Sequence, residues 1–156
     1  MIIPKNNGWE FLGFLPIKEE ELDRFYPIAG SFAVIKCEGK YLLCYNTWRE
    51  QWELPAGKRE IDETAAECAR RELYEETGQT PEELNFQGIM KVKNEDGTLK
   101  YNPVFTGVMQ ELQPFKKNDE TSEIFLWDME EGIGVIDEVD YWLLKSVVIE
   151  DSSKLD

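Results

Sequence analysis

The feature that most constrains this chain is a helix predicted over residues 64–77, because the sequence marks both of its ends. Thr64 followed by Glu67 is a capping box, in which each side chain accepts a free backbone N–H of the other residue. Gly78, with Pro81 soon after it, is typical of a helix end, since glycine readily adopts the left-handed conformation and proline cannot continue the helix. The sequence therefore predicts one well-bounded helix in the middle of the chain.

Two faces of this helix differ in chemistry. One stripe, at about 100° per residue, is small or aliphatic and can pack on a sheet; it consists of Ala66, Ala69 and Leu73. Glu72, Glu75 and Glu76 share an adjacent face at spacings i, i+3 and i+4, where like charges repel by some tenths of a kcal/mol, roughly 0.2–0.5 per pair. A divalent cation such as Mg²⁺, which takes oxygen ligands, offsets that repulsion. Residue types alone leave two interpretations open, a metal site and a solvated acidic face.

Apolar runs on both sides of the helix predict strands, with a tight turn at Glu38 and Gly39 and a break near Pro103. Further helices are predicted at residues 138–150 and, with a weaker pattern, at 18–25. The predicted strands are residues 30–37, 40–46, 86–93, 101–111 and 122–128. Strands that flank a helix in this way favour an α/β fold with a mixed sheet. No linker or repeat divides the chain, so we expect one domain over residues 1–156.

Charge and composition exclude several classes of function. With 17 basic and 32 acidic residues, the net charge of −15 disfavours binding to nucleic-acid polymers or anionic membranes, which depends on Lys and Arg. A phosphate-bearing ligand would need metal ions between it and the protein. The chain has no histidine, so its chemistry must use carboxylates, Lys, Tyr, Cys or water.

The cysteines and the N-terminal sequence bear on location. Cys37, Cys44 and Cys68 form no C-x-x-C pair, and an odd number of cysteines gives no complete disulfide framework. We therefore expect a reducing, cytoplasmic location. Neither a signal peptide nor a membrane span is visible.

Residues 57–79 carry a longer pattern. Gly57, five residues, Glu63, seven residues and then the run from Arg71 to Gly78 resemble the Nudix box, G-x5-E-x7-R-E-U-x-E-E-x-G-U, in which U is aliphatic. One position departs from it, because Gln79 occupies the final aliphatic site, and we expect a change in how the helix exit packs. The resemblance implies a Nudix hydrolase with an α/β/α sandwich, preceded by an N-terminal extension over residues 1–28 with strand and helix.

The resemblance also implies roles for the residues of the box. Glu72, Glu75 and Glu76 would bind Mg²⁺, for which Mn²⁺ would substitute, together with the carbonyl oxygen of Ala56 in the preceding loop. The paired Arg71 and Glu63 would orient these carboxylates; the alternative for both is an ordinary surface ion pair. Two or three metal ions would bind a diphosphate and lower the pKa of a water that attacks phosphorus.

The general base and the substrate depend on residues outside the box. In this family an acid on a late loop often serves as base, and Glu120 is our first choice, before Glu123; a polar loop without a catalytic role is the alternative. A nucleotide base would need an aromatic contact, although such residues more often belong to a core. The candidates are Phe32, Trp48, Tyr101 and Phe105.

Three functions remain open for a protein of this family. The favoured one is hydrolysis of a nucleoside diphosphate linked to another group, above all a (deoxy)nucleoside triphosphate or a modified nucleotide. The alternatives are an ADP-ribose or nucleotide-sugar pyrophosphatase and a noncatalytic nucleotide-sensing module. A homodimer is also possible, because Trp9, Phe11 and Phe14 make the N-terminal segment apolar.

Overall fold

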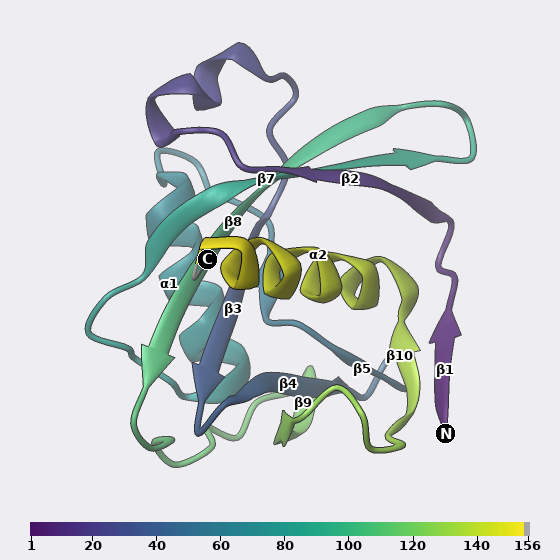
Figure 1. Ribbon diagram of the computed structural model, residues 1–156, viewed down its shortest axis with the longest axis vertical. Helices are drawn as coiled ribbons and strands as arrows, with labels where there is room; N and C mark the ends of the chain where they lie inside the picture. Colours follow the sequence, from purple (N-terminus) through teal and green to yellow (C-terminus); the bar gives the residue numbers. More distant parts are fainter. Residues whose placement is uncertain (155–156) are drawn as a thin grey trace.

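The protein is described by a computed structural model covering residues 1–154, in which two α-helices pack on one curled β-sheet (Figure 1). A short 3-10 helix, Glu19–Arg24, lies in the N-terminal segment. The helices are α1 (Ala65–Thr77) and α2 (Glu138–Lys154). The strands are β1 (Ile2–Lys5), β2 (Trp9–Leu15), β3 (Ser31–Cys37), β4 (Lys40–Asn46), β5 (Gln51–Glu53), β6 (Ala56–Gly57), β7 (Asn85–Asn94), β8 (Leu99–Met109), β9 (Thr121–Trp127) and β10 (Gly134–Asp137).

The sheet is mixed, as the sequence predicts. Its main path runs β1-β10-β5-β4-β3-β8-β7-β2, with β6 paired to β3 and β9 paired to β4. The pairs β1·β10, β10·β5 and β3·β8 are parallel, and the other pairs are antiparallel. The parallel pair β3·β8 lies near the centre, and α1 is part of the crossover between these strands, as a parallel connection requires.

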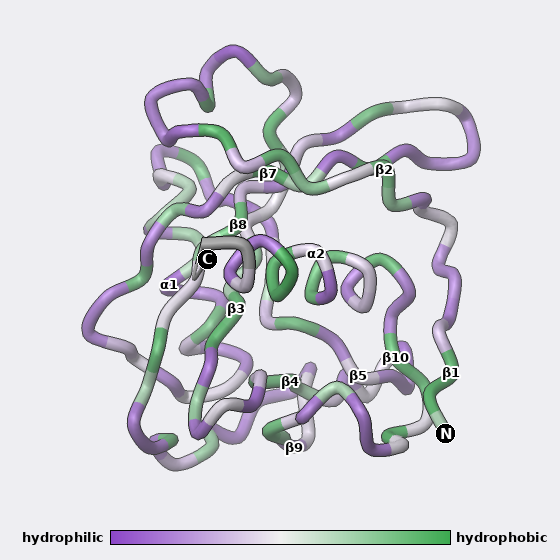
Figure 2. Tube along the Cα trace, in the orientation of Figure 1, coloured by the Kyte–Doolittle hydropathy of each residue, from purple (hydrophilic) through white to green (hydrophobic). Residues whose placement is uncertain are grey.

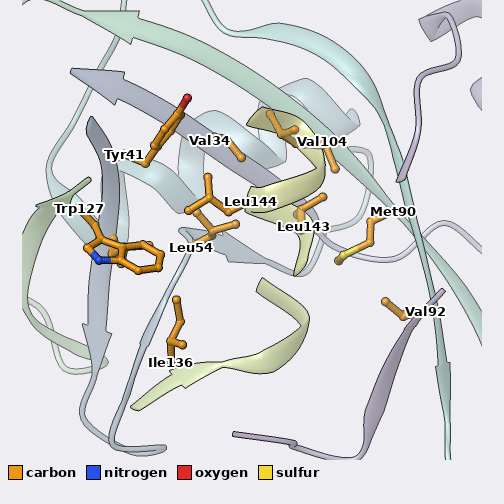
Figure 3. Close-up of a cluster of buried hydrophobic side chains, with 12 residues drawn as sticks. Val34, Tyr41, Leu54, Met90, Val92, Val104, Trp127, Ile136, Leu143 and Leu144 are labelled. Carbon is orange, nitrogen blue, oxygen red and sulfur yellow. The ribbon is translucent and has the colours of Figure 1, made fainter. Parts of the chain in front are cut away.

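The two helices cover opposite faces of the sheet, which the alternation of side chains along β3 makes plain. Ala33 and Ile35 belong to a cluster that contains Leu73 of α1, whereas Val34 between them belongs to a cluster with Leu143 of α2. Figure 3 shows Leu143 and Leu144 among side chains of the strands. Figure 2 shows hydrophobic and hydrophilic positions alternating around α2. The arrangement is the predicted α/β/α sandwich.

The N-terminal segment is built into the sheet at both of its edges. Strand β1 pairs with β10, and β2 pairs with β7. Trp9, Phe11 and Phe14 pack against the cluster that contains Leu143, so the side chains that suggested a homodimer already contact the chain's own core. Over residues 1–154, no helix is both long enough and apolar enough to cross a membrane.

Most predicted elements are present with ends shifted by one or two residues, and the Glu38-Gly39 turn has positive φ at both positions, 54° and 76°. The predicted break at Pro103 is wrong, because β8 continues through it. Successive N–H groups of a strand point to opposite sides, and the N–H of Tyr101 donates to Pro27 O, away from β7. The nitrogen of Pro103, two residues on, points the same way and leaves the β7·β8 ladder intact.

Candidate active site

Helix α1 has the predicted caps. The Thr64 hydroxyl accepts from Glu67 N at 3.1 Å, the Glu67 carboxylate accepts from Thr64 N at 2.9 Å, and Gly78 has φ 82°. Its buried stripe is rotated from the predicted one toward Cys68, so that Ala66 is only partly buried. The buried residues of α1 are Ala65, Cys68, Ala69, Leu73, Glu76 and Thr77. Glu76 therefore lies not on the predicted adjacent face but on the buried stripe itself, with 4% of its surface exposed.

The loop before α1 is held against the carboxylates of the helix. Strand β6 pairs with β3, which opposes Phe32 to Ala56. The Ala56 N–H donates to Glu76 Oε1 at 2.9 Å. A Cβ on Gly57 would overlap the carboxylate of Glu72, so glycine is required for the close approach of that side chain.

Arg71 joins the acidic side chains into one network. Its Nε and Nη2 bind both oxygens of Glu63, at 2.7 and 3.0 Å, while its Nη1 reaches Glu72 at 2.7 Å and Glu75 at 3.2 Å. The fifth bond, from Nη2 to the carbonyl of Lys58 at 2.8 Å, ties the preceding loop to the network. The hydrogen bonds from Arg71 lower the pKa of Glu63 to about 2. The predicted Arg71–Glu63 pair is thus present, and it holds Glu72 directly.

Glu76 and Glu120 come together although 44 positions separate them. Burial raises the pKa of Glu76 to about 11, and a hydrogen bond with the carboxyl group of Glu120 acts in the same direction. Burial likewise raises the pKa of Glu72, partly offset by Arg71. Two carboxylates in contact in a buried setting share a proton unless a cation lies between them.

The structure distinguishes the two candidate general bases. Glu120 is partly buried and directly precedes β9. The backbone N–H of Thr47 donates to the carbonyl oxygen of Glu120 at 2.9 Å. Glu123 is exposed. Its neighbour Ile124 packs in the cluster on the α1 face, and neighbouring side chains of a strand point to opposite faces. The Glu123 side chain therefore lies on the other face of β9, together with Phe125. Only Glu120 of this pair contacts the carboxylates of α1.

A cavity of about 350 Å³ opens beside Ala56 and Gly57. Of the four predicted aromatic contacts, Phe32 lines it. Phe105 does not line it: this residue is 1% exposed, and its ring packs edge-on against Phe86 at 5.6 Å beneath α1. Tyr101 packs on Phe25, with ring centroids 5.3 Å apart. Trp48, 66% exposed, lies in the turn between β4 and β5.

Several lining residues come from segments that sequence reasoning did not connect with a site. Trp9 is an aromatic wall from the N-terminal segment, and Lys100 lies over its ring at 5.0 Å. Other lining residues are Asn7, Arg49, Lys58, Met90, Val92, Asn102, Asp137 and Asp140. The apolar character of Trp9 is visible in the sequence, but its distance from the box hides where its side chain points.

The carboxylate and carbonyl oxygens of this region have the chemistry that Mg²⁺ prefers. Glu76, Glu72 and the Ala56 backbone meet there, and Glu120 adds a fourth oxygen donor group. Within residues 1–154, no three acidic or cysteine side chains converge as a ready-made metal site, since Glu72 and Glu75 bind Arg71. The chemistry of these donors fits a hard cation, which Glu72, Glu76 and the Ala56 carbonyl oxygen would hold.

Comparison with known proteins agrees with this geometry. The family model described as "NUDIX domain" matches residues 26–145. Phosphatase NudJ of Escherichia coli (strain K12) is 31% identical over 111 residues, which are 70% of this chain and 72% of that protein.

Solved structures share the fold. The Bacillus subtilis pyrophosphohydrolase BsRppH, solved as a mutant, has a TM-score of 0.67 at 20% identity and covers 92% of this chain and 88% of its own. The NUDIX domain of Shewanella oneidensis NrtR, complexed with ADP ribose, has a TM-score of 0.66 at 18% identity, with coverage of 86% and 99%. Because the family model matches most of the chain and its box residues meet in one site, the protein belongs to the Nudix hydrolase family.

Proposed function

We propose that this protein is a Mg²⁺-dependent pyrophosphohydrolase that cleaves a nucleoside diphosphate linked to another group, specifically a (deoxy)nucleoside triphosphate or a modified nucleotide. One observation carries the proposal. The paired carboxyl groups of Glu76 and Glu120 lie beside the loop at Ala56, which also lines a cavity with the aromatic walls Trp9 and Phe32. Phosphate chemistry and a nucleoside site are thus adjacent.

Residues of α1 and the preceding loop would hold the metal ions. We assign Glu72, Glu76 and the Ala56 carbonyl as ligands, with Glu75, 50% exposed at its side chain, at the outer edge. Bound Mg²⁺, or Mn²⁺ in its place, supplies positive charge that neutralises a diphosphate and makes a water molecule more acidic. Arg71 and Glu63 keep Glu72 in place through the bidentate pair.

Cationic side chains in the cavity wall support the proposed binding of phosphates. Arg49, Lys58 and Lys100 line it, against the two carboxylates Asp137 and Asp140. Arg49 is oriented by both oxygens of Glu53, through bonds of 2.7 and 3.1 Å. The charge of Arg49 is thus balanced by Glu53, and Lys58 and Lys100 would contact the phosphates together with the bound cations.

We assign the proton transfer to Glu120. Its carboxylate accepts a proton from the attacking water while the water oxygen forms a bond to phosphorus and the bridging P–O bond breaks, leaving two phosphate products. Glu120 suits this role because it contacts Glu76, and a cation bound at Glu76 would displace the shared proton and leave Glu120 ionised. Glu123, on the other side of β9, does not share this position.

The size of the cavity limits the substrate. A volume of about 350 Å³ is near the lower end of the roughly 300–1,000 Å³ of small-molecule sites. We expect this volume to hold one nucleoside, with Trp9 and Phe32 in the wall, and the second nucleoside of a dinucleoside polyphosphate to lie outside. This favours a nucleoside with a short phosphate chain.

The test is a phosphate-release screen with Mg²⁺ and an added phosphatase. The panel contains nucleoside triphosphates, oxidised nucleotides, ADP-ribose, nucleotide sugars and dinucleoside polyphosphates. We expect turnover of triphosphates or modified nucleotides that falls by about 10²–10⁴-fold in Glu120→Gln and stays near wild type in Glu123→Gln, a matched control. Preference for ADP-ribose would support the pyrophosphatase alternative, and nucleotide binding without cleavage would support the sensor.

The remaining expectations stand as proposals. A small-molecule substrate, without nucleic-acid polymer or membrane as partner, agrees with the net charge of −15. Cys37, Cys44 and Cys68 are free, as a cytoplasmic protein would have them. We treat residues 1–156 as one domain. Trp9, Phe11 and Phe14, which suggested a homodimer, are partly buried against the chain's own core.

A further inference from the structure

Gln79, the one residue of the box that departs from the family pattern, is completely buried. A buried amide costs free energy unless its donors and acceptor are paired. Here they are: Nε2 donates to Thr77 O at 3.0 Å and to Gln113 O at 2.8 Å, while Oε1 accepts from Gln113 N at 2.7 Å. The side chain of Gln79 thus pairs with the backbone of Gln113 on both of its polar groups.

Gln113 returns the interaction. Its side-chain oxygen accepts from Thr80 N at 2.8 Å, and its Nε2 donates to Thr80 O at 3.4 Å. Each glutamine therefore uses its amide to bind the backbone of the other segment, as two paired strands would. We call Gln79, Thr80 and Gln113 the amide clasp. It joins the end of α1 to the segment that leads from β8 to β9.

Beyond the clasp, this segment stays on the end of α1. A Cβ on Gly78 would lie 2.6 Å from the carbonyl oxygen of Pro114 and 2.8 Å from Lys116 N, so the backbones are in direct contact. The ammonium group of Lys116 lies 5.1 Å from the centre of the Tyr74 ring.

A second attachment comes directly after Glu120. Asn118 Oδ1 accepts from the N–H groups of Glu120 and Thr121, at 2.9 and 2.8 Å. The hydroxyl of Thr121 donates to the carbonyl oxygen of Glu76 at 2.7 Å. The loop over residues 114–120 is therefore fixed at both of its ends to the helix that carries Glu72 and Glu76.

We propose that the amide clasp holds the Glu120 loop against α1 and that Gln79 is thereby a positioning residue for the hydrolysis. The role in hydrolysis rests on the function proposed above. It is a property of this chain, because the box pattern places an aliphatic residue at this site. Gln79 touches no reacting atom. It fixes Gln113 and the loop, and the loop in turn sets the distance between Glu120 and Glu76.

The test is the substitution Gln79→Leu, which removes the side-chain amide and keeps a side chain of similar volume. Gln110→Leu is the control, because Gln110 is exposed and lies on the same segment. Amide hydrogen exchange in the metal-free protein should accelerate at least about tenfold over residues 113–121 in Gln79→Leu. Exchange within α1 should stay at the wild-type rate, and Gln110→Leu should exchange as wild type throughout. In the same variant kcat should fall about ten- to a hundredfold, as small displacements of catalytic groups do, with KM within about twofold of wild type.

Each outcome decides the proposal. A folded Gln79→Leu protein with wild-type exchange in the loop, or with wild-type kcat, overturns it. If Gln79→Leu does not fold, the exposed Gln113→Leu change removes only the bonds to Thr80 and should shift both measurements in the same direction by less; no shift refutes the clasp. A wild-type protein that turns over no substrate refutes the proposed function, and hydrogen exchange still decides whether the clasp holds the loop.

Discussion

Replacing Glu76 by Gln should stabilise the metal-free protein while removing its activity. The carboxyl group is 4% exposed, and burial with Glu120 beside it raises its pKa from 4.5 to about 11. At pH 7 the folded protein keeps the proton, whereas the unfolded chain has lost it. Folding then binds a proton, and the free energy of unfolding falls as pH rises above 4.5.

The magnitude follows from the pH alone as long as the folded pKa stays well above 7. The loss is about 1.4 kcal/mol for each pH unit above the unfolded value, or about 3 kcal/mol at pH 7. Glutamine keeps the shape and can still accept from Ala56 N without carrying a charge in the unfolded chain. Glu76→Gln should recover most of this free energy and have a flatter stability profile between pH 5 and 8.

The assay is urea unfolding with EDTA at pH 5, 6.5 and 8, followed by the fluorescence of the five tryptophans. Glu75→Gln, with a half-exposed side chain on the same helix, is the control for the unfolding measurement with EDTA and should keep the wild-type dependence of stability on pH. Adding Mg²⁺ should raise the Tm of wild type but not that of Glu76→Gln. A Glu76→Gln protein less stable than wild type at pH 8, or one that still hydrolyses substrate, would refute the reasoning.

Three further changes test other parts of the site. In Gly57→Ala the new Cβ displaces the Glu72 carboxylate. Turnover should therefore fall at least about 100-fold, and Mg²⁺ should no longer raise the Tm. Wild-type turnover in this variant would contradict the assignment of Glu72 as a metal ligand. Trp9→Leu should raise KM about five- to tenfold through loss of roughly 1–1.5 kcal/mol of ring contact, with kcat unchanged. The control Trp48→Leu should leave KM unchanged. Equal effects of the two substitutions on KM would show that Trp9 does not contact the nucleoside. Burial raises the pKa of Asp140 well above 3.8, and the charges of Asp137 and Glu53 raise it further, so the free energy of unfolding should fall as pH rises above 3.8. In urea unfolding at pH 8, Asp140→Asn should therefore be more stable than wild type. A less stable Asp140→Asn would show that the folded protein needs Asp140 as an anion.

The local parts of the fold were predictable because their signals lie within a few residues. The capping box at Thr64 and Glu67, the left-handed Gly78 and the Glu38-Gly39 turn all depend on neighbouring groups, and the structure has them where the sequence predicts them. Strands β5, β6 and β10 were not predicted as elements, and the bounds of β1 and β2 within the N-terminal extension were not predicted. They are short, or they pair with distant partners such as β1 with β10, and only pairing makes them strands.

The candidate site divides in the same way. The spacing of Glu63, Arg71, Glu72 and Glu76 determines that one helix and its leading loop bring these charges together, because the helical period and the Gly57 contact are local geometry. Tertiary structure alone decided that Glu76 is buried, that Phe105 belongs to the core and Trp9 to the cavity, and that Glu120 rather than Glu123 meets Glu76. These facts depend on which segments pack together across the sheet, and side chains far apart in the sequence carry no local signal of their eventual contact.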